Sequence, residues 1–232
     1  MASVKFKDQL DAANKLIEIL PKKELNDAKT IVLCMSLESV ILTDVVCRGL
    51  NLSYEMLFGE PIPAPNNSEC DVAIVSETED IVLNDPLIKA FNISYDYIYG
   101  EAHRKYEEKI LKNVYKYRKG NLIGELKDKN ILLIDEGCET GMTALICIKT
   151  LLDVKVKSIS YATPMIATDV FANLNDMVDE IYTINKIVDF IDVDSYYEKK
   201  IEATSERIMS ILEESPHYLP LQKQQGDKNN AI

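Results

Sequence analysis

The sequence is poor in the residues that build several common kinds of site. It has only two histidines, His103 and His217, and neither has suitably spaced partners, so a histidine-rich metal site is excluded. The five cysteines are odd in number and include none of the close pairs of zinc or thioredoxin-type motifs. We therefore expect most of the cysteines to be small buried residues.

Long apolar runs and positive charge are also scarce. No run approaches the roughly 18 apolar residues that a membrane span needs, and the opening MASVKFKDQLDAANK lacks the apolar core of a secretory signal. The sequence thus predicts a cytoplasmic protein with no membrane partner. The net charge of −12 argues against a nucleic-acid surface, since Lys and Arg supply most such affinity. Small anions would need a local positive field, a bound cation or aimed backbone dipoles.

The hydrophobic content of 47% is enough for one sizeable core. We expect a single domain over 1–232, made of an N-terminal helix in 1–29, a core in 30–200, and a C-terminal helix with a polar, frayed tail in 201–232. Apolar periodicity predicts an alternating α/β order. The expected helices are 7–20, 37–50, 84–91, 95–119, 142–152, 168–175 (capped by Thr168) and 195–214, and the expected strands are 30–35, 54–58, 71–75, 80–83, 131–134, 155–161 and 180–184. The stretch GEPIPAPNNSEC is interpreted as an irregular loop because of its prolines and asparagines.

The most informative segment is NILLIDEGCETGMTALICIKT, residues 130–150. An apolar strand ends in Asp135 and Glu136, at the sheet edge where open α/β sheets bind ligands. Two carboxylates there would accept hydrogen bonds from vicinal ribose hydroxyls. Gly137 and Gly141 permit a tight turn, and a 5′-phosphate fits the free N–H groups that open the next helix. The alternative is that the acids only cap a βα turn and offset the helix dipole, an effect of roughly 0.3–1 kcal/mol.

This string resembles the phosphoribosyl diphosphate motif of type I phosphoribosyltransferases, which matches at Asp135, Glu136, Thr140, Gly141 and Thr143. The resemblance covers residues 31–197 and is closest to uncharacterised phosphoribosyltransferase-like proteins, supported by PAPNNSECDVAIVSE and FIDVDSYYE. It implies a mostly parallel central sheet flanked by helices, with a small antiparallel hood formed by 71–75 and 80–83. It further implies that 120–128 is a loop that closes over the substrate. The implied substrate-binding residues are Ser36, Leu37, Glu38, Asp135, Glu136, Gly137, Cys138, Thr140, Gly141, Met142 and Thr143.

Two further residues of the motif have alternative interpretations. Glu139 stands at a position that is an acid in purine salvage members, where it acts as a base, so it is the candidate general base. Its alternative is a solvated loop carboxylate. The Cys138 thiol lies near a helix start, which could favour its thiolate. The alternative for Cys138 is a packing or backbone role.

The sequence departs from the family where positive charge is expected. The loop after the first strand is often Pro-Arg-Gly-Gly in the resembled group, whereas here it is Ser36, Leu37, Glu38 and Ser39. Gly59 and Glu60 likewise stand in place of an Arg-Lys pair. Both changes remove cations from the diphosphate side, where a preorganised donor commonly contributes about 3 kcal/mol. Arg104 and Lys105 of the charged helix 95–119 are candidate replacements.

Two functions follow from these residues. The first is a phosphoribosyltransferase that moves ribose 5-phosphate from magnesium-bound phosphoribosyl diphosphate to a nitrogenous acceptor, such as a purine-type base. The second is a non-catalytic ribonucleotide or phosphoribosyl sensor on the same fold, which the missing cations favour. A receiver-like signalling domain is disfavoured because a phosphate turn follows the acid pair. The resemblance implies Mg²⁺ carried by the substrate, with no direct protein metal site, and a homodimer.

Overall fold

The computed structural model describes residues 5–222, which form a parallel main sheet and a smaller antiparallel sheet. Within these residues the main sheet has five strands in the order β2-β1-β6-β7-β8. All four neighbouring pairs are parallel. The strands are β1 (Ile31–Cys34), β2 (Ser53–Met56), β6 (Asn130–Ile134), β7 (Ser158–Ala167) and β8 (Glu180–Ile187).

The central strand β6 is apolar throughout because both of its faces are covered. Leu132 and Ile134 contribute to the core on one face of the sheet, whereas Ile131 and Leu133 contribute to the core on the other. All four side chains are at most 1% exposed. Parallel strands buried on both faces show this continuous apolar pattern, and the predicted strand 131–134 is confirmed.

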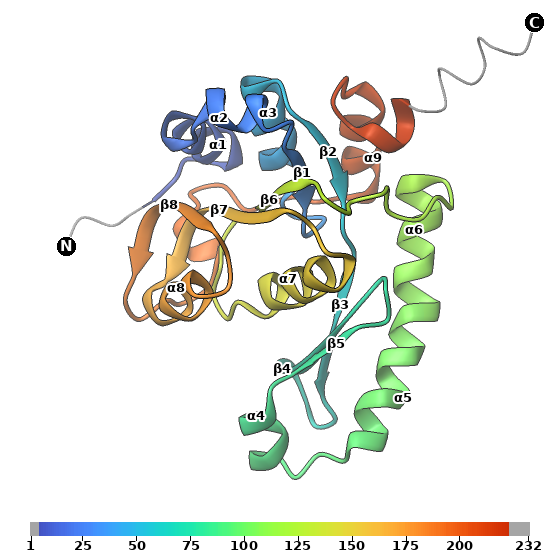
Figure 1. Cartoon of the computed structure of the whole chain (residues 1–232). Coiled ribbons are helices and arrows are strands. Elements are labelled where there is room, and N and C mark those ends of the chain that lie inside the picture. Colours follow the sequence, from blue (N-terminus) through green and yellow to red (C-terminus); the bar gives the residue numbers. More distant parts are fainter. Residues whose placement is uncertain (1–4, 223–232) are drawn as a thin grey trace, which may run out of the picture.

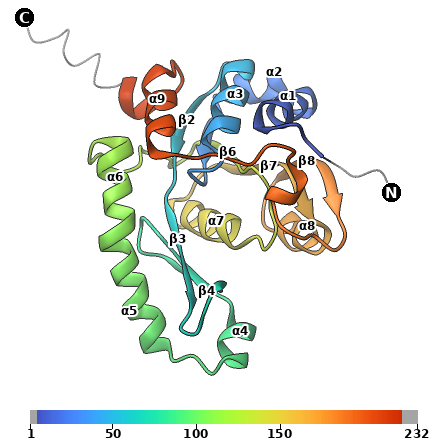
Figure 2. The same ribbon diagram turned by 180° about the vertical axis from the view of Figure 1, so that it is seen from behind.

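Helices cover both faces of the main sheet (Figure 1). On one face lie α1 (Gln9–Ile19), α2 (Lys22–Asp27) and α3 (Val40–Leu50), with α9 (Ser205–Glu214) beside α3. On the other face lie α7 (Met142–Val154) and α8 (Thr168–Asn175), and the view from behind shows the same two layers (Figure 2). None of the helices within residues 5–222 is both long and apolar enough to cross a membrane.

The smaller sheet forms the predicted hood. Its antiparallel strands are β3 (Gly59–Ala64), β4 (Asn67–Ser76) and β5 (Ile81–Leu83), and it packs on α7. The helix α4 (Asp85–Ala90) follows β5. A long helical rod then runs back along the hood to the main sheet (Figure 1), made of α5 (Tyr95–Lys105), a π-helical turn η1 (Tyr106–Ile110) and α6 (Leu111–Arg118).

A buried ion pair fixes the rod to the base of the hood. The Arg118 guanidinium, which is 0% exposed, donates to the Glu77 carboxylate, and the backbone N–H of Phe58 donates to the same carboxylate at 3.0 Å. The segment that follows is held as well, because the N–H of Gly124 donates to Glu55 at 3.0 Å. The hood, the rod and the 120–128 segment are therefore anchored to the main sheet at one place.

The structure corrects several sequence-based boundaries. The stretch predicted as irregular contains β3 and the start of β4. Pro61 and Pro63 lie in an edge strand of the hood, where a missing N–H is tolerated, and Pro65 lies in the turn to β4. The last helix begins at Ser205, since 194–196 form only a short 3-10 turn (η2, Asp194–Tyr196). The cap of α8 is Ala167, without a side-chain bond, and not Thr168. In the tail, Tyr218 is fully buried against Tyr54, with 5.2 Å between ring centroids, and 223–232 lie outside the described residues.

Candidate functional site

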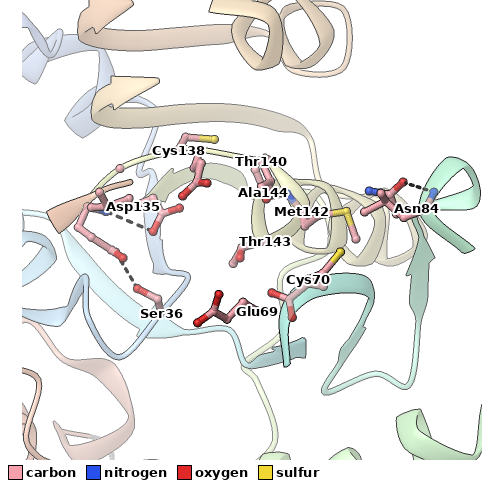
Figure 3. A pocket seen from close by; sticks show the side chains of 17 residues that line it. Ser36, Glu69, Cys70, Asn84, Asp135, Cys138, Thr140, Met142, Thr143 and Ala144 are labelled. Carbon is pink, nitrogen blue, oxygen red and sulfur yellow. Dashed lines mark hydrogen bonds between the residues drawn. The ribbon is translucent and has the colours of Figure 1, made fainter. Parts of the chain in front are cut away.

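A cavity of about 410 Å³ opens where β1 and β6 end, at the carboxyl edge of the main sheet. Its floor is the segment that the sequence singled out, and its far wall comes from the hood (Figure 3). Pockets of this size hold small ligands. The lining residues are Ser36, Glu69, Cys70, Asp71, Asn84, Leu87, Asp135, Glu136, Gly137, Cys138, Glu139, Thr140, Gly141, Met142, Thr143, Ala144 and Val193.

The acid pair is held firmly at the start of this floor. Asp135 is only 6% exposed, and its Oδ1 accepts the backbone N–H of Glu136 at 3.2 Å. The Glu136 Oε2 accepts from the Ser36 hydroxyl at 2.8 Å. The Tyr197 hydroxyl donates to the backbone carbonyl of Glu136 at 2.7 Å. Contacts from β1, β6 and the C-terminal region therefore fix the pair in one orientation.

Burial makes both carboxyl groups reluctant to ionise. It raises the pKa of Asp135 well above its usual range, and the adjacent Glu136 raises it further. Burial also raises the pKa of Glu136, although hydrogen bonds from its neighbours, including Ser36, oppose this effect. Two acids held together at a cost in free energy, and facing a cavity, are typical of a binding or catalytic site.

The turn after the acids has one position whose backbone conformation and close packing favour glycine. Gly141 has φ of +72°, and a Cβ there would lie 2.7 Å from Cγ1 of Val170. Upstream, the backbone of Cys138 pairs with β7. The N–H of Cys138 donates to the carbonyl of Met165, and the carbonyl of Cys138 accepts the N–H of Ala167, both at 2.9 Å. One end of the turn is thus fixed to the sheet and the other is shaped by Gly141.

The turn ends in a helix start that faces the cavity. Thr140 Oγ1 accepts the N–H of Met142 at 3.4 Å. Within the described residues, the N–H groups of Thr143 and Ala144 have no hydrogen-bond partner, as expected in the first turn of a helix. Both residues line the cavity. The free N–H groups and the positive end of the α7 dipole create a place for an anion.

The structure separates the two interpretations of Cys138. Its side chain is 3% exposed, and burial raises the pKa of its thiol to about 12. A stabilised thiolate requires the opposite shift, so the burial of Cys138 favours a packing and backbone role. Glu139, by contrast, is exposed at the cavity, and partial burial followed by the charge of Asp192 raises its pKa.

The loop after β1 is closed by its own side chains. Ser36 Oγ accepts the N–H of Ser39 at 2.9 Å, and Ser39 Oγ accepts the N–H of Ser36 at 3.3 Å. Of the loop residues predicted to bind substrate, Ser36 lines the cavity, whereas Leu37 and Glu38 do not. Leu37 packs against the core, and the carbonyl of Glu38 accepts from Gln9 at 2.6 Å.

Sequence reasoning missed the hood wall of the cavity. Glu69, Cys70 and Asp71 line it from β4, and Figure 3 shows Glu69 and Cys70 on one side with Thr140 and Cys138 on the other. Their stretch was interpreted as an irregular loop-to-strand passage, so only its match to the resembled group pointed to it. Tyr197 was also missed as a contact of Glu136, although it lies within the matching FIDVDSYYE passage.

The cavity lining is strongly acidic. Glu69, Asp71, Asp135, Glu136 and Glu139 all contribute carboxylates, whereas no Lys or Arg of residues 5–222 lines the cavity. Arg104 is engaged by Glu101 and Glu108 on its own helix, at 2.6 and 2.7 Å. The charge of Lys105 acts on one of the residues that line the cavity. Burial raises the pKa of Asp71, and the positive charge of Lys105 opposes that rise.

Among solved structures, the chain resembles TT1426 from Thermus thermophilus with a TM-score of 0.72, at 24% identity over 91% of this chain and 99% of that one. A hypoxanthine phosphoribosyltransferase from Staphylococcus aureus gives 0.43 at 14% identity (78% and 75% covered), and a purine phosphoribosyltransferase from Pyrococcus horikoshii Ot3 gives 0.39 at 13% (79% and 92%). No family model matches the chain, and no curated protein matches it.

The parallel order β2-β1-β6-β7-β8 with an antiparallel hood packed on α7 decides the fold. The chain has the type I phosphoribosyltransferase fold. The fold class expected from the motif is thereby confirmed, and the cavity lies at the edge of the sheet where this architecture places its βα loops.

Proposed function

We propose that the cavity binds ribose 5-phosphate as part of phosphoribosyl diphosphate, and that the protein is a phosphoribosyltransferase. The observation that carries the proposal is the juxtaposition, in one cavity, of a held acid pair and an open helix start. Asp135 and Glu136 would accept hydrogen bonds from the two ribose hydroxyls. The N–H groups of Thr143 and Ala144, with the Thr140 and Thr143 hydroxyls, would hold the 5′-phosphate.

In the proposed reaction an acceptor nitrogen attacks the anomeric carbon of the ribose. The bond from that carbon to diphosphate breaks, and the acceptor loses a proton. Glu139 is the proposed proton acceptor, because it lines the cavity and its raised pKa makes it a better base near neutral pH than an ordinary carboxylate.

We propose that magnesium enters this site as a companion of the substrate. Within residues 5–222 no group of three or more His, Cys, Asp or Glu side chains is placed to hold a metal ion. Mg²⁺ commonly binds through one or two carboxylates together with substrate phosphates, and the acidic lining offers such carboxylates. When bound, the ion would neutralise charge on the diphosphate, and Lys105 is the proposed protein cation on that side.

A specific observation favours a second candidate function, a non-catalytic sensor of a ribonucleotide or phosphoribosyl group. The Ser36–Ser39 loop uses its own N–H groups internally, and no cation of the described residues lines the cavity. A leaving diphosphate would therefore receive little direct stabilisation from the protein.

The decisive assay uses isotopically labelled phosphoribosyl diphosphate with Mg²⁺ and a panel of purine, pyrimidine and amine acceptors. Acceptor-dependent release of diphosphate that disappears in Asp135→Ala supports the transferase. Binding of a nucleoside monophosphate without release identifies the sensor, and absence of any binding contradicts both functions.

A further inference from the structure

A second cavity of about 410 Å³ lies between the starts of α1 and α9, and it shares no lining residue with the candidate site. Its walls come from α1, α3, α9 and the segment 199–202 that precedes α9. We call it the basic cavity, and its lining residues are Asp8, Gln9, Leu10, Ile41, Lys199, Lys200, Ile201, Glu202 and Arg207.

The charge of the basic cavity is opposite to that of the candidate site. Lys199, Lys200 and Arg207 line it together with only two acids, Asp8 and Glu202. The candidate site, by contrast, has five carboxylates and no Lys or Arg of residues 5–222 in its lining. In a chain with a net charge of −12, such a local excess of positive charge favours small anions.

The cations of the basic cavity are available to a ligand. Lys199 pairs with Asp8 at 2.9 Å, and Arg207 pairs with Glu202 at 3.9 Å. Solvent reaches both pairs, so they contribute little to stability. Within the part of the chain that the structure describes, the Lys200 ammonium has no hydrogen bond or ion pair. An anion could therefore bind here without the loss of a buried contact.

Other features of the wall suit a phosphate group. The first residues of α1 and the first turn of α9 both line the cavity, and phosphates bind at helix starts beside Arg and Lys. Gln9 is only 5% exposed, and its Oε1 has no hydrogen-bond partner among residues 5–222. A ligand hydroxyl is the kind of donor that this oxygen lacks.

The lining also includes apolar surface. Ile41 and Ile201 are half-buried, and Leu10 is 53% exposed. An inorganic ion would leave these side chains in contact with water, whereas an organic phosphate would cover them with its apolar part.

Two short routes connect the basic cavity to the acid pair. On the first, Gln9 Nε2 donates to the carbonyl of Glu38 in the loop after β1, at 2.6 Å. On the second, the hydroxyl of Tyr197, two residues before Lys199, donates to the carbonyl of Glu136 at 2.7 Å. A ligand that holds the walls of the basic cavity would therefore stabilise the arrangement that orients the acid pair.

We propose that the basic cavity is an effector site for a small organic phosphate. The phosphate contacts Lys199, Lys200 and Arg207, and the apolar part of the ligand contacts Ile41 and Ile201. The site itself is independent of the proposed transferase, whereas its effect on the acid pair rests on the proposed ribose 5-phosphate site.

Hydrogen exchange followed by mass spectrometry locates the site. Phenyl phosphate should slow exchange in segments 5–12 and 196–207 of the wild type, and not in Lys200→Gln/Arg207→Gln. Half-maximal protection should need about tenfold more inorganic phosphate, because that ion covers no apolar surface. Benzoate, which replaces the phosphate by a carboxylate, should protect less than phenyl phosphate. Circular dichroism would show that the variant is folded.

Lys23→Gln/Lys112→Gln is the matched control, because both lysines are exposed and lie outside the two cavities, and the change in charge is equal. The control variant should keep the wild-type protection. Calorimetry then compares ribose 5-phosphate binding to the two variants. Their affinities should be equal without phenyl phosphate. In its presence the control should bind about fivefold more tightly, since phenyl phosphate can only compete in the variant that lacks the basic cavity.

Absence of protection in the wild type would overturn the proposal. Equal protection in Lys200→Gln/Arg207→Gln would overturn the assignment of the site to these cations. Equal ribose 5-phosphate affinities of the two variants with phenyl phosphate present would overturn the effector role. A wild type that shows the protection but does not bind ribose 5-phosphate would contradict the proposed function and the effector role, and would support the second site.

Discussion

Two loops at the same edge of the main sheet differ in what they offer a ligand. The loop after β6 presents an acid pair, a glycine turn and unpaired N–H groups at the start of α7. The loop after β1 closes on itself through Ser36 and Ser39 and adds the negative charge of Glu38. Both follow strands buried on both faces, so the difference lies in the loop residues and not in the scaffold. The first loop suits a pentose phosphate, whereas the second lacks the features that suit a diphosphate.

The largest effect is expected from reshaping the first loop. Gly141→Ala places a Cβ 2.7 Å from the Val170 side chain at a φ of +72°, so the turn or Val170 must move. We expect ribose 5-phosphate affinity to fall about 100-fold, because small displacements of a positioned site have effects of this size. Calorimetry would measure this loss.

Gly100→Ala is the control for the glycine substitution, since no atom lies within 4 Å of the new Cβ and the position is helical. It should leave binding unchanged and stabilise the helix by up to about 1 kcal/mol. Wild-type affinity in Gly141→Ala, with an intact circular dichroism spectrum, would argue against the turn as the phosphate site.

The second loop can be made more like the expected diphosphate loop. Burial is the main cause of the raised pKa values of Asp135 and Glu136, and the Glu38 charge contributes to both. Glu38→Arg should therefore tighten phosphoribosyl diphosphate binding relative to ribose 5-phosphate by about tenfold, or roughly 1.4 kcal/mol. Glu18→Arg, an equal charge change at an exposed position of α1, should not. If both variants tighten phosphoribosyl diphosphate binding equally in calorimetry, the effect comes from net charge and not from the position of Glu38 in the loop.

A smaller effect concerns the free energy of unfolding. The pKa of Asp135 is higher in the folded than in the unfolded chain, so stability falls as pH rises from the unfolded value of about 3.9 towards the folded one. Asp135→Asn removes this loss and keeps an oxygen for the Glu136 N–H. We expect its Tm at pH 7 to rise by about 2–4 °C, which corresponds to roughly 1 kcal/mol, with little change at pH 4. Thermal melts at both pH values measure this, and a lower Tm at pH 7 would contradict it.

The smallest expected effect is a difference in labelling rate between the thiols of the two cavity walls. Cys138 is buried with a pKa raised to about 12, whereas Cys70 is half-buried and lines the hood side. An uncharged maleimide should modify Cys70 before Cys138, and GMP should slow the reaction at Cys70. Mass spectrometry of the labelled peptides measures both rates. Faster labelling of Cys138 would place the ligand path elsewhere.

The sequence was sufficient for features that depend on local pattern. The strand over 131–134, the turn and the helix start at Met142 were predicted because buried parallel strands, acids and glycines leave a clear local pattern. The hood was expected from only two of its three strands, because Pro61 and Pro63 obscure β3.

Contacts between distant segments could not be predicted from that pattern. Glu69 reaches the cavity because of a bulge, which depends on how β3 pairs with β4. Tyr197 reaches Glu136 because 197–204 is not helical, although the sequence predicted a helix over 195–214. Both depend on tertiary packing, which overrides local propensity.

The central claim, a pentose phosphate on the loop after β6, is tested most directly by a crystal soaked with ribose 5-phosphate. We predict the phosphate at the N–H groups of Thr143 and Ala144 and the ribose hydroxyls at Asp135 and Glu136. A sugar phosphate bound only at another surface, or an empty cavity at saturating ligand, would contradict the claim.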